Sequence, residues 1–176
     1  MKKVYTDFLI PPFHYFAVLS KGEALYEWAI PAIITGIAFL IGYLLKLPFD
    51  ANFLKQYVGV LINLLAILVG FTITSVAIFV TIDMTKDGFL SKKSGRDIYG
   101  SSISWYHFIY LNLVQAIITG IIFLGLSLAS FLLLAREIKC FLPVIFILLT
   151  FGTAHILLLS MRNITNLYFA FFEESK

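Results

Sequence analysis

The sequence predicts an all-α, polytopic membrane protein with four transmembrane helices and both termini in the cytoplasm. Hydrophobic residues make up 60% of the 176 residues, and charged residues only 13%, about half the share usual in soluble domains. The few charged residues leave four long uncharged runs between them. Lys and Arg are also concentrated in the two terminal segments and the middle loop, which four successive spans would place on the same side of the membrane.

The same composition excludes several classes of protein. So much apolar surface could not be covered in a soluble domain of this length. The net charge of +3 is too small for direct nucleic-acid binding. Cys140 is the only cysteine, so neither an intramolecular disulfide nor a cysteine-rich metal motif is expected.

The N-terminal segment, residues 1–23, is expected to be cytoplasmic and to lie on the membrane surface. It begins with two lysines, but Asp7 and the Pro11-Pro12 pair interrupt its apolar part, and no clear cleavage site follows. A cleaved signal peptide is therefore not expected. The prolines favour a short interfacial helix over a membrane-spanning one.

Four uncharged runs predict the transmembrane helices. They cover residues 28–45, 56–82, 98–135 and 140–161. Each reaches or approaches the ~20 apolar residues needed to cross a bilayer, whereas β-barrel strands would alternate apolar and polar residues. With short extensions, the helices are expected at about 26–46, 54–83, 103–135 and 141–162.

The connecting segments set the expected orientation. Residues 84–101 form the longest loop, and the candidate helix-capping serines Ser102 and Ser104 follow it. Residues 163–176 form a C-terminal tail. This loop, the N-terminal segment and the tail, counted together with Arg162 at its start, hold nine of the 13 Lys and Arg residues, against four in the other two loops. The bias predicts a cytoplasmic location for the former set in a multi-pass membrane protein.

Small and polar residues form a stripe on the second predicted helix. Its members recur every three or four residues and include Gly59, Asn63, Gly70 and Thr74. Such a stripe lets helices approach closely and form hydrogen bonds across the contact. It could alternatively line a pore between several copies.

The third predicted helix carries a similar polar group, formed by Asn112, Gln115 and Thr119. Asn112 and Gln115 could pair with Asn63 within one chain, or they could face a neighbouring subunit. Both alternatives stay open at this stage.

His155 is the one ionisable side chain that the sequence places deep in a span. It is either a proton-sensitive relay or gate, or a neutral histidine hydrogen-bonded to a neighbouring helix. The other two histidines, His14 and His107, are not at metal-ligand spacing from it or from each other. No metal and no cofactor is expected.

Catalytic motifs are missing from the sequence, so the protein is not expected to be an enzyme. The most distinctive polar segment is the basic loop with Lys86, Lys92, Lys93 and Arg96. These residues are expected to contact anionic membrane lipids or to bind a soluble cytoplasmic protein partner.

The four-helix plan and the segment LVGFTITSVAIFVT, residues 68–81, resemble small membrane proteins of bacterial anti-phage defence systems, of the Kiwa membrane-subunit type. The resemblance implies a homo-oligomeric sensor in the inner membrane that engages a cytoplasmic DNA-binding effector.

Two functions follow from these observations. The first is an inner-membrane sensing and partner-binding subunit that assembles with itself and recruits or regulates a cytoplasmic partner in antiviral defence. The alternative is an oligomeric ion channel or a membrane-disrupting effector.

Overall fold

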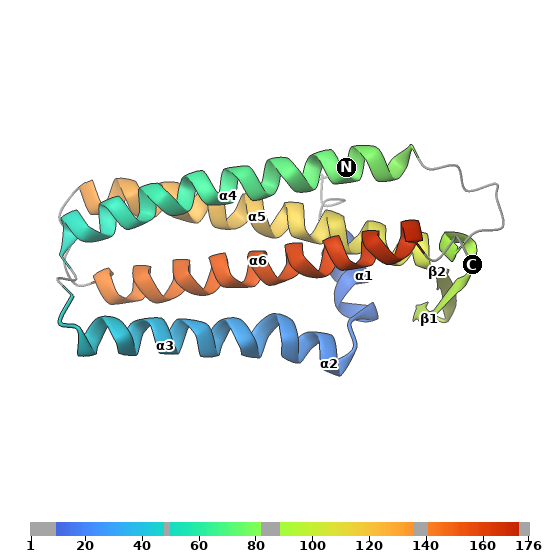
Figure 1. Ribbon diagram of the computed structural model, residues 1–176, viewed down its shortest axis with the longest axis horizontal. Helices are drawn as coiled ribbons and strands as arrows, with labels where there is room; N and C mark the ends of the chain where they lie inside the picture. The colour runs from blue at the N-terminus through green and yellow to red at the C-terminus, as the bar shows by residue number, and fades with distance from the viewer. Residues whose placement is uncertain (1–9, 48–49, 82–88, 136–140, 173–176) are drawn as a thin grey trace, which may run out of the picture.

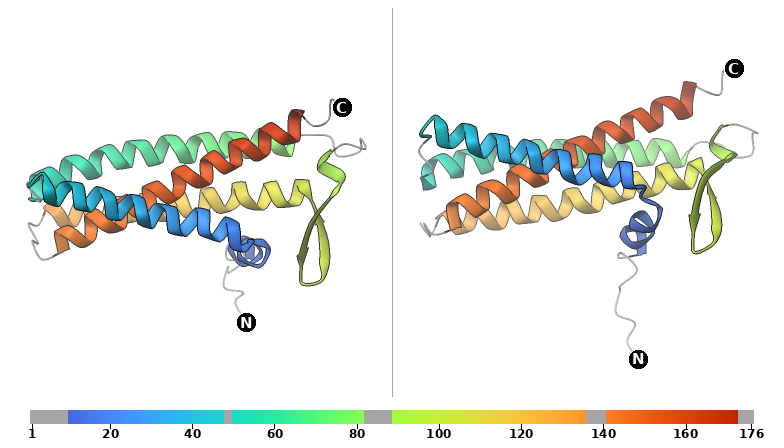
Figure 2. Two further views of the ribbon diagram at one scale, coloured as in Figure 1. Left: turned by 60° about the horizontal axis from the view of Figure 1, so that its bottom comes forward. Right: turned by 90° about the horizontal axis from the view of Figure 1, so that it is seen from below.

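A computed structural model of the 176-residue chain describes residues 10–47, 50–81, 89–135 and 141–172. Four helices are long and apolar enough to cross a membrane, which confirms the predicted all-α transmembrane class. They lie side by side along the long axis of the molecule (Figure 1). A short cross helix and a β-hairpin lie at one end of this bundle, which we call the hairpin end (Figure 2).

The first transmembrane helix is continuous from Lys21 to Leu44 but changes its winding on the way. It consists of α2 (Lys21–Ala24), the π-helical turn η2 (Leu25–Ala29) and α3 (Ile30–Leu44). Ser20 caps its start through a capping box with Glu23. The π turn lies just before Pro31, which has no N–H to donate to the fourth residue before it, Glu27.

The other three spans are α4 (Ala51–Val80), α5 (Trp105–Ala135) and α6 (Leu142–Phe172), of 30, 31 and 31 residues. Asp50 caps α4 by accepting a 2.8 Å hydrogen bond from the Phe53 amide. At 1.5 Å per residue these helices are about 45 Å long, more than the ~30 Å hydrocarbon core. α6 continues ten residues beyond its expected end at residue 162.

Packing within the bundle is uneven. α4, α5 and α6 pack against one another, whereas α3 packs mainly along α6. Two glycines permit the close contacts: a Cβ on Gly120 of α5 would collide with Val69 of α4, and one on Gly152 of α6 would collide with the Phe123 ring. Of the four spans, α6 is the most enclosed and the first transmembrane helix, Lys21–Leu44, the least enclosed.

The cross helix α1 (Ile10–Val18) lies across the bundle at the hairpin end and packs on α5 (Figure 2). Pro11 and Pro12 occupy its first turn, where helical N–H groups have no intrahelical acceptor. Tyr15 and Val18 are its buried residues.

A β-hairpin was not expected from the sequence, which suggested a loop through residue 101. After a short 3-10 turn, η3 (Phe89–Ser91), strands β1 (Lys93–Ile98) and β2 (Ser101–Ser104) pair antiparallel. Tyr99 and Gly100 form the turn, both with positive φ. Ser104 then directly precedes α5 and accepts a 3.4 Å hydrogen bond from the His107 amide, near the start expected for that helix.

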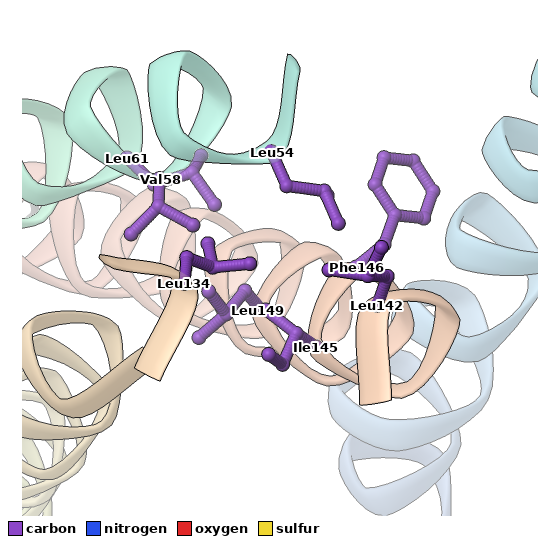
Figure 3. Packing of buried hydrophobic residues seen from close by; sticks show 8 residues of the cluster. All are labelled: Leu54, Val58, Leu61, Leu134, Leu142, Ile145, Phe146 and Leu149. Atoms are coloured by element: carbon purple, nitrogen blue, oxygen red, sulfur yellow. The ribbon is translucent and has the colours of Figure 1, made fainter. Parts of the chain in front are cut away.

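The core differs between the two ends. At the end opposite the hairpin it contains a cluster of buried apolar residues (Figure 3), which consists of Leu54, Val58, Leu61, Leu134, Leu142, Ile145, Phe146 and Leu149. Toward the hairpin end, buried polar and charged residues appear between the helices, and the candidate site lies there.

Candidate functional site

Glu27 is the central residue of the site. It lies on the π turn, about 9 Å along the first transmembrane helix, and none of its surface is exposed. Its carboxylate accepts a hydrogen bond from the Tyr15 hydroxyl of α1 and forms an ion pair with Arg162 of α6. A buried carboxylate is tolerated in a membrane span only with such partners.

Pro31 explains how His155 joins this group. Because Pro31 has no N–H, the Glu27 carbonyl is left without its usual helical donor. The Nδ1 atom of His155 lies 2.6 Å from that carbonyl oxygen, and since a carbonyl can only accept, Nδ1 carries the proton. His155 thus has a partner on the neighbouring helix, and its proton-sensitive role stays a prediction.

Arg162 connects the first helix to α5. Its NH2 group donates a 2.6 Å hydrogen bond to Oδ1 of Asn112, and its NH1 group lies 3.8 Å from Oε1 of Glu23. Its Nε atom is buried and makes no hydrogen bond to any described residue. The guanidinium therefore bridges three helices, and its Nε–H is still available to donate a hydrogen bond.

Glu23 links this interior to the hairpin. Arg96 of β1 forms two hydrogen bonds to the Glu23 carboxylate, at 2.7 and 2.8 Å. The same guanidinium donates to the Val18 carbonyl at 2.6 Å and lies 4.3 Å from the centre of the Phe108 ring. One arginine thus ties β1 to α1, α2 and α5.

Together, Arg96, Glu23, Arg162 and Glu27 form what we call the charge network, in which positive and negative groups alternate. It runs from the half-exposed hairpin to the fully buried Glu27. Two cations and two anions balance, as a low-dielectric location requires. A surface recess of about 360 Å³ opens over Glu23 and Arg162, with Gly22, Tyr26, Met161 and Thr165 completing its wall.

Asn112 and Gln115 both lie inside the bundle, beside the charge network. They are 1% and 7% exposed. Asn112 pairs with Arg162, and its carbonyl accepts a 3.4 Å bond from Asn163. The Gln115 amide donates to the Thr119 hydroxyl at 3.1 Å. Asn112 thus joins a network within one chain, but that network does not include Asn63.

The stripe on α4 instead faces away from the bundle. Asn63, Gly70 and Thr74 are exposed and Gly59 is partly exposed. A Cβ on either glycine would meet open space. Thr74 bonds the Gly70 carbonyl of its own helix at 3.0 Å, whereas Asn63 has no side-chain partner among the described residues. The stripe packs against no other helix of this chain.

The residues of the predicted basic site do not share one environment in the structure. Lys92 and Lys93 are exposed, whereas Arg96 points into the molecule and is held by Glu23. Lys86 lies outside the described residues. Binding of lipid or protein by these residues stays a prediction.

Sequence reasoning missed Glu23, Glu27 and Tyr15, and it wrongly left His155 as the only ionisable group deep in a span. The uncharged runs end, by construction, at the first charged residue, so Glu27 and Arg162 fell just outside them. The spacing of Glu23 and Glu27, one helical turn apart, was the available signal.

Two further observations complete the site. Among residues 10–47, 50–81, 89–135 and 141–172, no group of three His, Cys, Asp or Glu side chains could hold a metal ion.

An apolar groove of about 650 Å³ separates parts of α3 and α6, with Gly36 and Phe39 on one wall and Leu148 and Phe151 on the other.

Comparisons of the chain with protein-family models, with curated proteins and with solved structures found no match.

Proposed function

We propose that the protein is a homo-oligomeric subunit of the bacterial inner membrane that senses a membrane event and docks a cytoplasmic protein. The observation that carries this proposal is the outward stripe on α4. The resemblance to small membrane proteins of anti-phage defence systems implies that such a subunit engages a cytoplasmic effector. The proposed role is binding, not catalysis.

The position of Asn63 supports self-assembly. It is the thirteenth residue of a 30-residue span, close to the middle of the hydrocarbon layer, and it faces outward without a partner among the described residues. A side-chain amide in lipid has unmet hydrogen-bonding capacity. Asn63 of a second copy, at the same depth across a symmetry axis, satisfies that capacity.

The neighbours of Asn63 favour the same contact. The stripe residues Gly59 and Gly70 are small, and the space over them is open, so a second helix can approach closely. Val60 and Ile67, one turn before and one turn after Asn63 on the same face, are apolar and about two-thirds exposed. Apolar side chains are thus available to pack around Asn63 in such a contact.

Docking is assigned to the hairpin end. Nine of the 13 basic residues belong to the segments predicted for the cytoplasm, and Lys92 and Lys93 are exposed on the hairpin. An acidic protein surface or anionic lipid headgroups fit this charge.

The assembly is tested by cysteine crosslinking in membranes, in a Cys140→Ser background. We expect Asn63→Cys to form a disulfide-linked dimer and Leu64→Cys, at similar depth but directed away from the stripe, to form far less. In the same membranes, Asn63→Leu is expected to lower self-association measured by energy transfer, and Val60→Leu to leave it unchanged. Equal crosslinking at both positions would contradict the proposed interface.

Docking is tested separately by a pull-down from membranes. Changing Lys92 and Lys93 to Glu is expected to lower recovery of the partner, with Asp97→Lys, on the same strand, as the matched control. Unchanged recovery would remove the docking role from the hairpin lysines.

An oligomeric channel is the second candidate, because Asn63 and Thr74 face outward and could line an axis between copies. The apolar cluster fills the interior of the protomer at the end opposite the hairpin (Figure 3), so a pore across that end would have to run between protomers. Conductance in planar bilayers that is abolished by Asn63→Leu would favour the channel over the docking subunit.

A further inference from the structure

The hairpin is attached to the bundle by two different kinds of contact. Ile98 and Ile103 pack on the apolar cluster that includes Phe108 and Leu90. Arg96 adds a polar attachment, with three hydrogen bonds to Glu23 and Val18. The apolar contact is non-directional, so the polar one fixes where the hairpin sits.

Glu23 is shared between two arginines that belong to different parts of the molecule. Its Oε1 atom accepts from Arg96 at 2.8 Å and lies 3.8 Å from NH1 of Arg162. Arg162 still has a buried Nε without a hydrogen-bond acceptor among the described residues. The Arg162 guanidinium therefore offers the Glu23 carboxylate a second binding position, next to its present position on Arg96.

The first transmembrane helix is the least enclosed of the four spans. Only 17% of its span is buried, against 50% of the α6 span, and the apolar groove of about 650 Å³ lies between the two helices. Glu23 is on the first transmembrane helix, Arg162 on α6 and Arg96 on the hairpin. A shift of the first helix along α6 thus changes the distances from Glu23 to both arginines at once.

We propose that the Glu23–Arg96 contact is a latch that holds the hairpin on the bundle, and that Glu23 releases the hairpin by transferring to Arg162. The inference rests on the proposed function in one respect, that the hairpin is the docking surface. Release moves Lys92 and Lys93 away from the bundle end, so the latch links the helix arrangement in the membrane to the presentation of these lysines.

The latch is tested by the distance between spin labels at Ser102 on β2 and Ile164 on α6, both exposed. The labels are introduced by cysteine substitution in Cys140→Ser protein in lipid nanodiscs. We expect one narrow distance in the parent, with a released minority below about 10%. Arg96→Gln is expected to lower the docked-to-released ratio about 5- to 150-fold, with Lys93→Gln as the matched control.

A second variant tests the transfer itself. Arg162 is removed together with its buried partner, as Glu27→Gln/Arg162→Gln, so that no buried charge is left unpaired. Without Arg162 as an alternative partner, Glu23 is expected to stay on Arg96, and the docked-to-released ratio is expected to equal or exceed that of the parent.

Two outcomes would overturn the latch: an unchanged narrow distance in Arg96→Gln, or release in the double variant equal to that in Arg96→Gln. The first would show that apolar contacts alone hold the hairpin, and the second that Arg162 supports docking. Neither result depends on crosslinking at Asn63 or on partner recovery, so the latch and the proposed function can fail separately.

Discussion

Replacing Glu27 by Gln tests the assignment of the buried charges most directly. The change keeps the size of the side chain but removes the negative charge that pairs with Arg162. Breaking a buried ion pair by removing one partner costs about 3–5 kcal/mol, because the remaining charge is left uncompensated. Here Arg162 keeps Asn112 and has Glu23 at 3.8 Å, so we expect the low end, about 3 kcal/mol.

The assay is reversible unfolding in mixed micelles by a denaturing detergent, followed by circular dichroism. The double variant Glu27→Gln/Arg162→Gln is expected to recover most of the lost free energy of unfolding, because the two amides leave no unpaired buried charge. Asp97→Asn, on an exposed site of β1, is the matched control and should change stability by less than about 0.5 kcal/mol.

Two results would refute this reasoning. A loss below about 1 kcal/mol for Glu27→Gln would mean that the ion pair is hydrated as a surface pair is. A double variant that is less stable than Glu27→Gln would mean that Arg162 contributes through other contacts and not through Glu27.

Two further predictions concern the helix contacts. Gly152→Ala is expected to destabilise the protein by about 1–3 kcal/mol in the same assay, because its Cβ meets the Phe123 ring; a neutral result would mean that the α5–α6 contact is looser than described. Pro31→Ala supplies an N–H that competes for the Glu27 carbonyl, so we expect His155 to lose its Nδ1 hydrogen bond, as read from the ¹⁵N chemical shifts of its ring; unchanged shifts would contradict the role given to Pro31.

The transmembrane architecture could be predicted from the sequence because it depends on composition over long windows. A run such as 56–82 contains no charged residue and can be stable only in lipid or a large core. The four helices found in the structure confirm this prediction. The orientation predicted from Lys and Arg is a statement about the surrounding membrane and stays a prediction.

The charge network could not be predicted in the same way. Glu27 and Arg162 are 135 residues apart in the sequence, and each stands next to an apolar run as an ordinary interfacial charge would. Only the packing of α6 against the first helix brings them together. The exposure of Asn63 likewise depends on which face of α4 the core uses, and apolar residues occur on every face of that helix.

The hairpin was missed for a local reason. Its strands contain Ser94, Gly95 and Asp97, which have low β propensity. Gly95, with a φ of 73°, lies in the irregular register between Lys93 and Arg96. The pairing is favoured by apolar contacts of Ile98 and Ile103 with the bundle, and these contacts are not apparent in the local sequence.

The pairing of the first helix with the last has a consequence for biosynthesis. Glu27 and its ion-pair partner Arg162 are 135 residues apart in the sequence, and at about 5–20 residues per second the ribosome needs roughly 7–27 s to make that stretch. Throughout this interval the nascent first helix carries a carboxylate whose cationic partner does not yet exist. Because an unpaired charge in a membrane span is costly, we expect that helix to stay at the lipid–water boundary, or beside the insertion machinery, until α6 emerges, and a chain stalled before α6 to present a charged, unpaired segment to membrane quality control.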